Sequence, residues 1–115
     1  MKHKKQDNFL SYIPEKNSNY QSHTNEEGRV VITVPHKGLF DRIAQVLFFQ
    51  PKQTFLKLDA LGSFVWQQID GTITVEELAQ KVDLKFGETA APLYHRLTLF
   101  LQILHKNQFV RFHKN

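Results

Sequence analysis

Histidines are the side chains of this sequence best suited to bind a metal or to move a proton near neutral pH. The 115-residue chain has six of them and no cysteine. None pairs at a spacing that metal ligands use: His95 and His105 are ten residues apart, which on a helix is about 80° short of a whole number of turns. We therefore predict no metal site. The lack of a thiol excludes a disulfide framework, a thiolate metal site and a cysteine nucleophile.

The carboxylates are explained better by helix ends and turns than by acid–base chemistry. Asp59, Glu76 and Glu77 stand where helices are expected to begin, and Asp70 precedes a glycine in a turn. The sequence has no glycine-rich phosphate loop, and no serine lies in a nucleophile motif. These observations favour a protein that is not an enzyme and that carries no cofactor.

The positive charge lies mostly at the two ends of the chain. The formal net charge is +4, and six positive side chains near the termini leave the remainder slightly negative: Lys2, Lys4, Lys5, Lys106, Arg111 and Lys114. Charged ends are typical of solubilising tails rather than of nucleic-acid surfaces. The first residues lack an apolar run of signal-peptide length, and no stretch approaches the roughly 18 apolar residues of a membrane span. We expect a cytoplasmic protein that binds neither membrane nor nucleic acid.

The segment from Thr54 to Val75 organises the rest. Residues 54–59 read as a strand in which Leu56 and Leu58 share one face and Phe55 and Lys57 share the other. Asp59 is a good N-cap for a helix over residues 60–70, which ends at Asp70-Gly71. Thr74 and Glu77 then match a capping box at the start of a helix over residues 75–86.

We predict a flexible or loosely packed tail over residues 1–18 and one domain over residues 19–115. Residues 20–24 and 29–34 form a hairpin around a turn at 25–28, and RVVITV is the strongest strand signal in the chain. An extra helix over residues 39–49 separates this hairpin from the third strand.

The C-terminal part predicts a third helix, capped by Thr89 and with Pro92 in its first turn. A short closing strand follows at 109–112. The fold class is then α+β: a three-stranded antiparallel sheet followed by a three-helix bundle, winged helix-turn-helix-like, with the extra helix inserted between strands two and three.

Two helices joined by a short glycine turn raise the possibility of a winged-helix DNA binder or transcriptional regulator. The third helix, however, begins with Glu88-Thr89-Ala90-Ala91-Pro92, which lacks the basic and amide side chains of a DNA reader, and the stretch 72–104 carries more acidic than basic residues. Peptide capture is the alternative use, because an open edge strand beside an apolar helix can accept an extended segment. A structural or homodimerisation module that uses the apolar helix is a third reading.

Several of these residues resemble the pattern of the PqqD family, coenzyme PQQ synthesis protein D. The pattern stands here as Leu58-Asp59-Ala60-Leu61-Gly62-Ser63-Phe64-Val65-Trp66, Asp70-Gly71 and Thr74-Val75-Glu76-Glu77-Leu78. Phe86-Gly87, the leucine-rich third helix and Phe109-Val110 also fit, so the resemblance covers about residues 29–112. The link over residues 36–52 is longer than the family pattern leads us to expect, and it would cover or form part of the groove.

The resemblance implies a RiPP recognition element, a peptide chaperone that binds the leader of a ribosomally made precursor peptide. Its partners would be that peptide and a modifying enzyme, often a radical SAM protein, in natural product biosynthesis. The leader would add to the third strand beside the third helix. Carried onto this chain, the implied peptide-binding residues are Phe55, Leu56, Lys57 and Leu58 on the strand and Leu93, Arg96, Leu97 and Phe100 on the helix.

Overall fold

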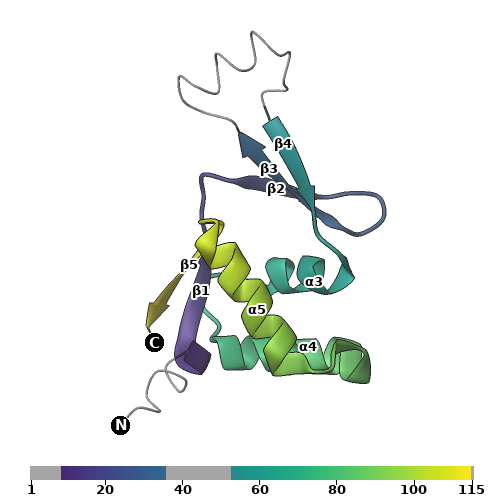
Figure 1. Ribbon diagram of the computed structural model, residues 1–115, viewed down its shortest axis with the longest axis vertical. Helices are drawn as coiled ribbons and strands as arrows, with labels where there is room; N and C mark the ends of the chain where they lie inside the picture. Colours follow the sequence, from purple (N-terminus) through teal and green to yellow (C-terminus); the bar gives the residue numbers. More distant parts are fainter. Residues whose placement is uncertain (1–8, 36–52, 115) are drawn as a thin grey trace.

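Two small antiparallel sheets and a group of helices make up the computed structural model, an α+β protein (Figure 1). The structure describes residues 9–35 and 53–114. Its elements in chain order are β1 (Tyr12–Lys16), β2 (Gln21–Thr24), β3 (Val30–Pro35), β4 (Gln53–Lys57), α3 (Ala60–Gln68), α4 (Val75–Phe86), the 3₁₀ helix η1 (Gly87–Ala90), α5 (Leu93–Lys106) and β5 (Val110–Lys114). The expected helix over residues 39–49 lies outside the described residues.

The larger sheet has the strand order β2-β3-β4, with both pairs antiparallel. The turn between β2 and β3 is held by Asn25, whose Oδ1 accepts hydrogen bonds from the amides of Glu27 at 2.9 Å and Arg29 at 3.0 Å. Gly28 in this turn has a φ of 82°, a conformation that glycine adopts at little cost. These three strands correspond to the three predicted from the sequence.

The second sheet pairs β1 with β5, and half of it was not predicted. Tyr12 lies opposite Lys114 and Lys16 lies opposite Val110. Ile13 and Pro14 are buried. The expectation of a flexible or loosely packed tail over residues 1–18 is therefore wrong for β1. Pro14 argues against a strand when the sequence is read alone. Proline is nevertheless tolerated in an edge strand such as β1, which pairs only with β5 in its sheet.

The predicted N-caps of α3 and α4 are confirmed, whereas α3 ends at Gln68, with Ile69 as its C-cap, before the predicted end at Asp70-Gly71. Oδ1 of Asp59 accepts a hydrogen bond from the Gly62 amide at 2.7 Å. Thr74 and Glu77 form a capping box, with reciprocal bonds of 3.1 and 2.9 Å. Each bond satisfies an amide that has no partner inside its own helix.

The start of α5 differs from the prediction. Thr89 lies in η1 rather than at the cap, and its hydroxyl donates to the Phe86 carbonyl at 2.6 Å. Pro92 is the residue that precedes α5, and it makes no side-chain cap bond. The glycine turn at Gly87 thus continues into a short 3₁₀ helix before the chain enters α5.

The core lies where the inner face of the larger sheet meets the helices. Val30 and Ile32 of β3 belong to one buried cluster with side chains of α3, α4 and α5, among them Trp66, Leu78 and Leu101. The indole Nε1 of Trp66 donates to Oγ of Ser22 at 3.0 Å, which attaches β2 to α3. The winged helix-turn-helix arrangement stays a prediction, because the second sheet of β1 and β5 was not part of it.

Candidate functional site

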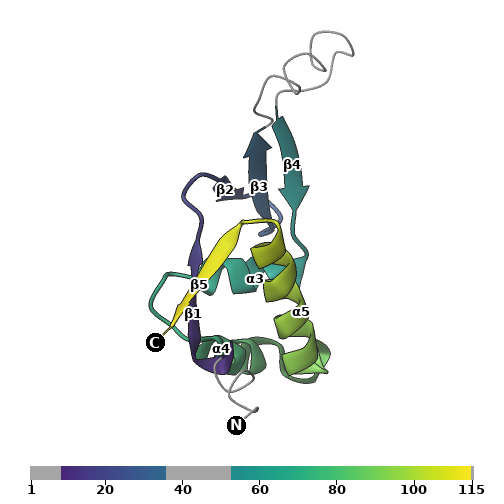
Figure 2. The same cartoon turned by 60° about the vertical axis from the view of Figure 1, so that its left-hand side comes forward.

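The strand β4 lies at the edge of the larger sheet. It pairs with β3 on one side, and within the described ranges 9–35 and 53–114 no strand pairs with its other side. Figures 1 and 2 show β4 running down toward α3. Of the two halves of α5, the C-terminal half lies closer to the lower end of β4. An edge of this kind exposes backbone donors and acceptors that another extended chain can use.

The two faces of β4 differ in what they can touch. Leu56 lies directly opposite Ile32, a core residue, so its side chain shares the inner face of the sheet. It is nevertheless 39% exposed, because it stands at the edge. Phe55 lies opposite Thr33 on the outer face and is 63% exposed. An exposed aromatic next to an exposed leucine is unusual at a strand edge that no other strand covers.

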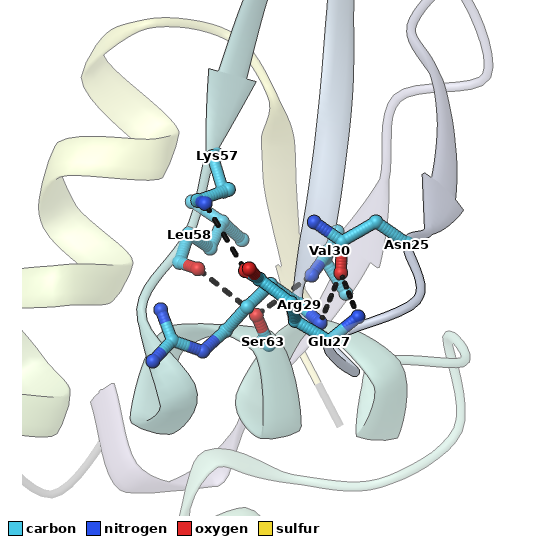
Figure 3. Close-up of polar contacts among 7 residues, drawn as sticks. All are labelled: Asn25, Glu27, Arg29, Val30, Lys57, Leu58 and Ser63. Carbon is cyan, nitrogen blue, oxygen red and sulfur yellow. Dashed lines mark hydrogen bonds and ion pairs between the residues drawn. The ribbon is translucent and has the colours of Figure 1, made fainter.

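The lower end of β4 is fixed by a hydroxyl from α3 (Figure 3). Oγ of Ser63 accepts the Val30 amide at 2.8 Å and donates to the Leu58 carbonyl at 3.3 Å. The Leu58 amide in turn donates to the Val30 carbonyl at 2.9 Å. Ser63 is the buried polar residue of the described chain, and this closed set of bonds satisfies it. The edge strand is thereby attached to the helical core at one defined point.

Lys57 adds an ion pair on the outer face. Its Nζ lies 3.3 Å from Oε1 of Glu27 in the β2–β3 turn, and both side chains are exposed. Such a pair contributes little to stability. It does balance the charge beside the open edge (Figure 3).

One flank of α5 is apolar and partly exposed. Phe100 packs against α3, where its ring atoms would lie 3.1 Å from a Cβ added to Gly62. At about 100° per residue, Ile103 lies some 60° and Leu99 some 100° farther around the helix from Phe100. Ile103 and Leu99 are each about half exposed. This flank, formed by Leu99, Phe100 and Ile103, is called the α5 flank below.

The predicted peptide-binding residues are not all at this surface. Leu58 and Leu97 are 7% and 2% exposed and belong to the core, so a segment docked on the surface would meet them only through their neighbours. Arg96 donates from Nη1 to the Thr89 carbonyl at 2.9 Å.

Leu93 lies toward α4 instead. It lines a cavity of about 450 Å³ with Ala79, Gln80, Asp83, Leu84 and Tyr94. Phe55, Leu56, Lys57 and Phe100 therefore remain the predicted residues around the edge of β4 and the α5 flank. Leu99 and Ile103 were not among the predicted peptide-binding residues; the signal that could have found them is that they are apolar residues of α5 outside its buried side of Leu97, Leu101 and Leu104.

Two titratable groups near the second sheet, Lys16 and Asp70, have lowered pKa values. Burial beside Trp66 lowers the pKa of Lys16, opposed by the charge of Asp70; its Nζ lies 5.2 Å from the indole ring centroid. The pKa of Asp70 is lowered by hydrogen bonds from the Thr72 hydroxyl and amide. Among the described residues, no three histidines or carboxylates are grouped so that they could hold a metal ion. Nor is any helix of that part long and apolar enough to cross a membrane.

The model of the PqqD family, described as coenzyme PQQ synthesis protein D, matches residues 44–110. That segment is more than half of the 115-residue chain. The chain belongs to the PqqD family. PqqD proteins are accessory proteins that bind peptides and enzyme partners and are not themselves catalysts. The match contains β4, all three described α-helices and the first residue of β5, whereas the β2–β3 hairpin precedes it. No curated protein and no solved structure matches the chain significantly.

Proposed function

We propose that this PqqD-family chain is a non-catalytic adaptor that captures the leader of a ribosomally made precursor peptide. The leader adds as a strand to the open edge of β4, and the adaptor presents it to a modifying enzyme such as a radical SAM protein. Backbone hydrogen bonds provide affinity, and the side chains around the edge provide selectivity. Membership of the family and the open edge of β4 are the observations that support this proposal.

The surroundings of the edge favour a peptide over a nucleic acid. Leu56 and the α5 flank supply apolar surface on the side toward the helices, and Lys57 is already paired with Glu27. At the start of α5, where a winged-helix reader would contact bases, Tyr94 and His95 are exposed. A complex in the micromolar range needs about −8 kcal/mol, which a groove of this kind can supply.

The proposal is tested by titrating isotope-labelled full-length chain with synthetic peptides of about 20 residues. Together the peptides cover the products of the short open reading frames that lie next to the gene for this chain. We expect a peptide that shifts the amide resonances of β4 and of the C-terminal half of α5. Ile103→Asp, which places a charge on the α5 flank, should weaken that complex at least tenfold.

Leu84→Asp is the matched control. Leu84 is 88% exposed on α4 and lines the cavity on the other side of α5, so its replacement should leave binding unchanged. Equal loss of binding in both variants, or peptide-induced shifts confined to α4, would contradict the proposal.

A further inference from the structure

The hydrogen bonds between β3 and β4 determine which backbone groups of β4 face outward. The Leu58 amide donates to the Val30 carbonyl at 2.9 Å, and the register that pairs Lys57 with Val31 places these two residues directly opposite. In an antiparallel pair, bonded and non-bonded positions alternate. Leu56 is therefore bonded to β3, whereas Lys57 is not. The same alternation leaves the N–H and C=O groups of Phe55 unbonded to β3.

The β2–β3 hairpin leads independently to the same assignment. The Asn25 amide donates to the Arg29 carbonyl at 2.8 Å, so these opposed residues form a bonded pair. Two residues farther along each strand, His23 and Val31 form the next bonded pair. The backbone groups of Val31 thus face β2, which leaves those of Ile32 for Leu56 on β4. The pairing of β3 with β4 and the pairing of β2 with β3 therefore agree: the backbone N–H and C=O groups of Phe55 and Lys57 face the open side of β4.

We infer, resting on the proposed function, that β4 accepts its peptide in one fixed register. An antiparallel peptide strand bonds to the N–H and C=O groups of Phe55 and Lys57. The peptide residue between these two bonding positions carries an apolar side chain. The substrate class is thus an extended segment with an obligatory apolar residue at one position and relaxed requirements on either side.

The apolar requirement follows from the faces of the strand. The middle peptide residue lies beside Leu56, and its side chain shares the inner face of the sheet. On the side toward the helices the chain continues from β4 into the first turn of α3, against which Phe100 of the α5 flank packs. Leu99 and Ile103 of the same flank expose apolar side chains. A charged or amide side chain placed there would lose water without gaining a partner.

The two bonding residues of the peptide meet a different surface. Their side chains stand on the outer face beside Phe55 and Lys57. The exposed ring of Phe55 favours an aromatic or β-branched neighbour, as cross-strand pairs do. Because Nζ of Lys57 already lies 3.3 Å from Glu27, the structure assigns no charge preference to the position beside it.

Proline at position 57 tests the register on the protein side. Lys57→Pro removes an N–H that faces outward and leaves the bonds of β4 to β3 in place, since proline is tolerated on the open side of an edge strand. We expect affinity to fall by about tenfold or more, because one hydrogen bond accounts for about 2- to 10-fold and the ring also obstructs the incoming backbone. Lys57→Ala keeps the N–H and should bind within about twofold of the original chain.

A positional-scanning library of end-blocked nonapeptides tests the register on the peptide side, with the unaltered full-length chain. We expect a single position that tolerates only apolar residues, flanked by positions that tolerate many types. Binding of library peptides with no such position, or undiminished binding by a folded Lys57→Pro variant, would overturn the register while leaving the adaptor function intact. If no library peptide and no genome-encoded peptide binds, the proposed function itself fails.

Discussion

The ring of Phe100 occupies the space that a side chain on Gly62 would need. A Cβ at Gly62 would stand 3.1 Å from two ring carbons of Phe100 and 3.0 Å from Oδ1 of Asp59. Neither neighbour can move freely, since Asp59 caps α3 and Phe100 packs against the core. This close approach sets the α5 flank against the first turn of α3, directly after β4. Gly62 thereby positions one wall of the candidate site.

Gly62→Ala should therefore destabilise the protein, although alanine is the better helix former. Overpacking costs about 1–3 kcal/mol and the helix propensity returns about 1 kcal/mol, so we expect a net loss of about 1 kcal/mol in the free energy of unfolding. Adding Phe100→Leu, which removes the crowded ring atoms, should recover part of this loss in a double-mutant cycle measured by urea unfolding. A single variant as stable as the original would show that the contact is not tight.

Ser63→Ala should destabilise the junction between β4 and α3. The substitution leaves the buried Val30 amide without its 2.8 Å acceptor, which costs about 1–3 kcal/mol. Gln67→Ala is the control from the same helix: its exposed 3.3 Å bond to Thr24 should contribute less than about 0.5 kcal/mol. Urea unfolding of both variants measures the difference, and equal stabilities would be inconsistent with the closed set of bonds around Ser63.

Ile13→Ala distinguishes a strand from a tail. Ile13 is buried in β1, which pairs with β5, so the truncation should cost about 2–4 kcal/mol. A residue in a loosely packed tail would cost almost nothing when truncated. Thermal unfolding of this variant beside Ser18→Ala, an exposed position in the following turn, separates the two cases.

The carboxyl of Asp70 predicts a small acid dependence of stability. Its pKa lies below the ordinary value of 3.8, chiefly because the Thr72 hydroxyl donates to it at 2.8 Å. The folded state thus binds this proton more weakly than the unfolded chain does. The resulting stabilisation is present above pH 3.8 and is lost as the pH falls through the lower pKa of the folded state.

Thr72→Val removes the hydroxyl and keeps the shape. The pKa of Asp70 should then rise toward 3.8, as followed by carbon-detected NMR of the side-chain carboxyl. The acid dependence of unfolding below pH 4 should flatten correspondingly. An unchanged pKa in the variant would mean that the amide bonds alone hold the carboxylate.

Local chemistry made the caps and strands of this fold predictable. Asp59, Thr74 and Glu77 act within three residues of themselves, so their roles can be recognised in the sequence and are confirmed. The strands β2, β3 and β4 were likewise indicated by turn residues and β-branched runs. The start of α5 was misjudged because Thr89 satisfies the Phe86 carbonyl, an alternative that local pattern does not distinguish from an N-cap.

Long-range relationships were the part that could not be predicted. The pairing of β1 with β5 joins residues almost a chain length apart, and nothing in the local pattern around Pro14 specifies it. The same holds for the candidate site. Leu97 and Phe100 were predicted together as peptide-binding residues of the third helix. Leu97 is 2% exposed and belongs to the core, whereas Phe100 is only partly buried and packs on Gly62, a difference that helical spacing does not reveal.

Hydrogen exchange of the β4 amides is the most direct test of peptide binding at the open edge. With a bound peptide, the Phe55 and Lys57 amides should become strongly protected, because they gain acceptors from the added strand. The Leu56 and Leu58 amides already donate to β3 and should change little. A peptide that binds while the exchange of Phe55 and Lys57 stays as fast as in the free protein would contradict the account.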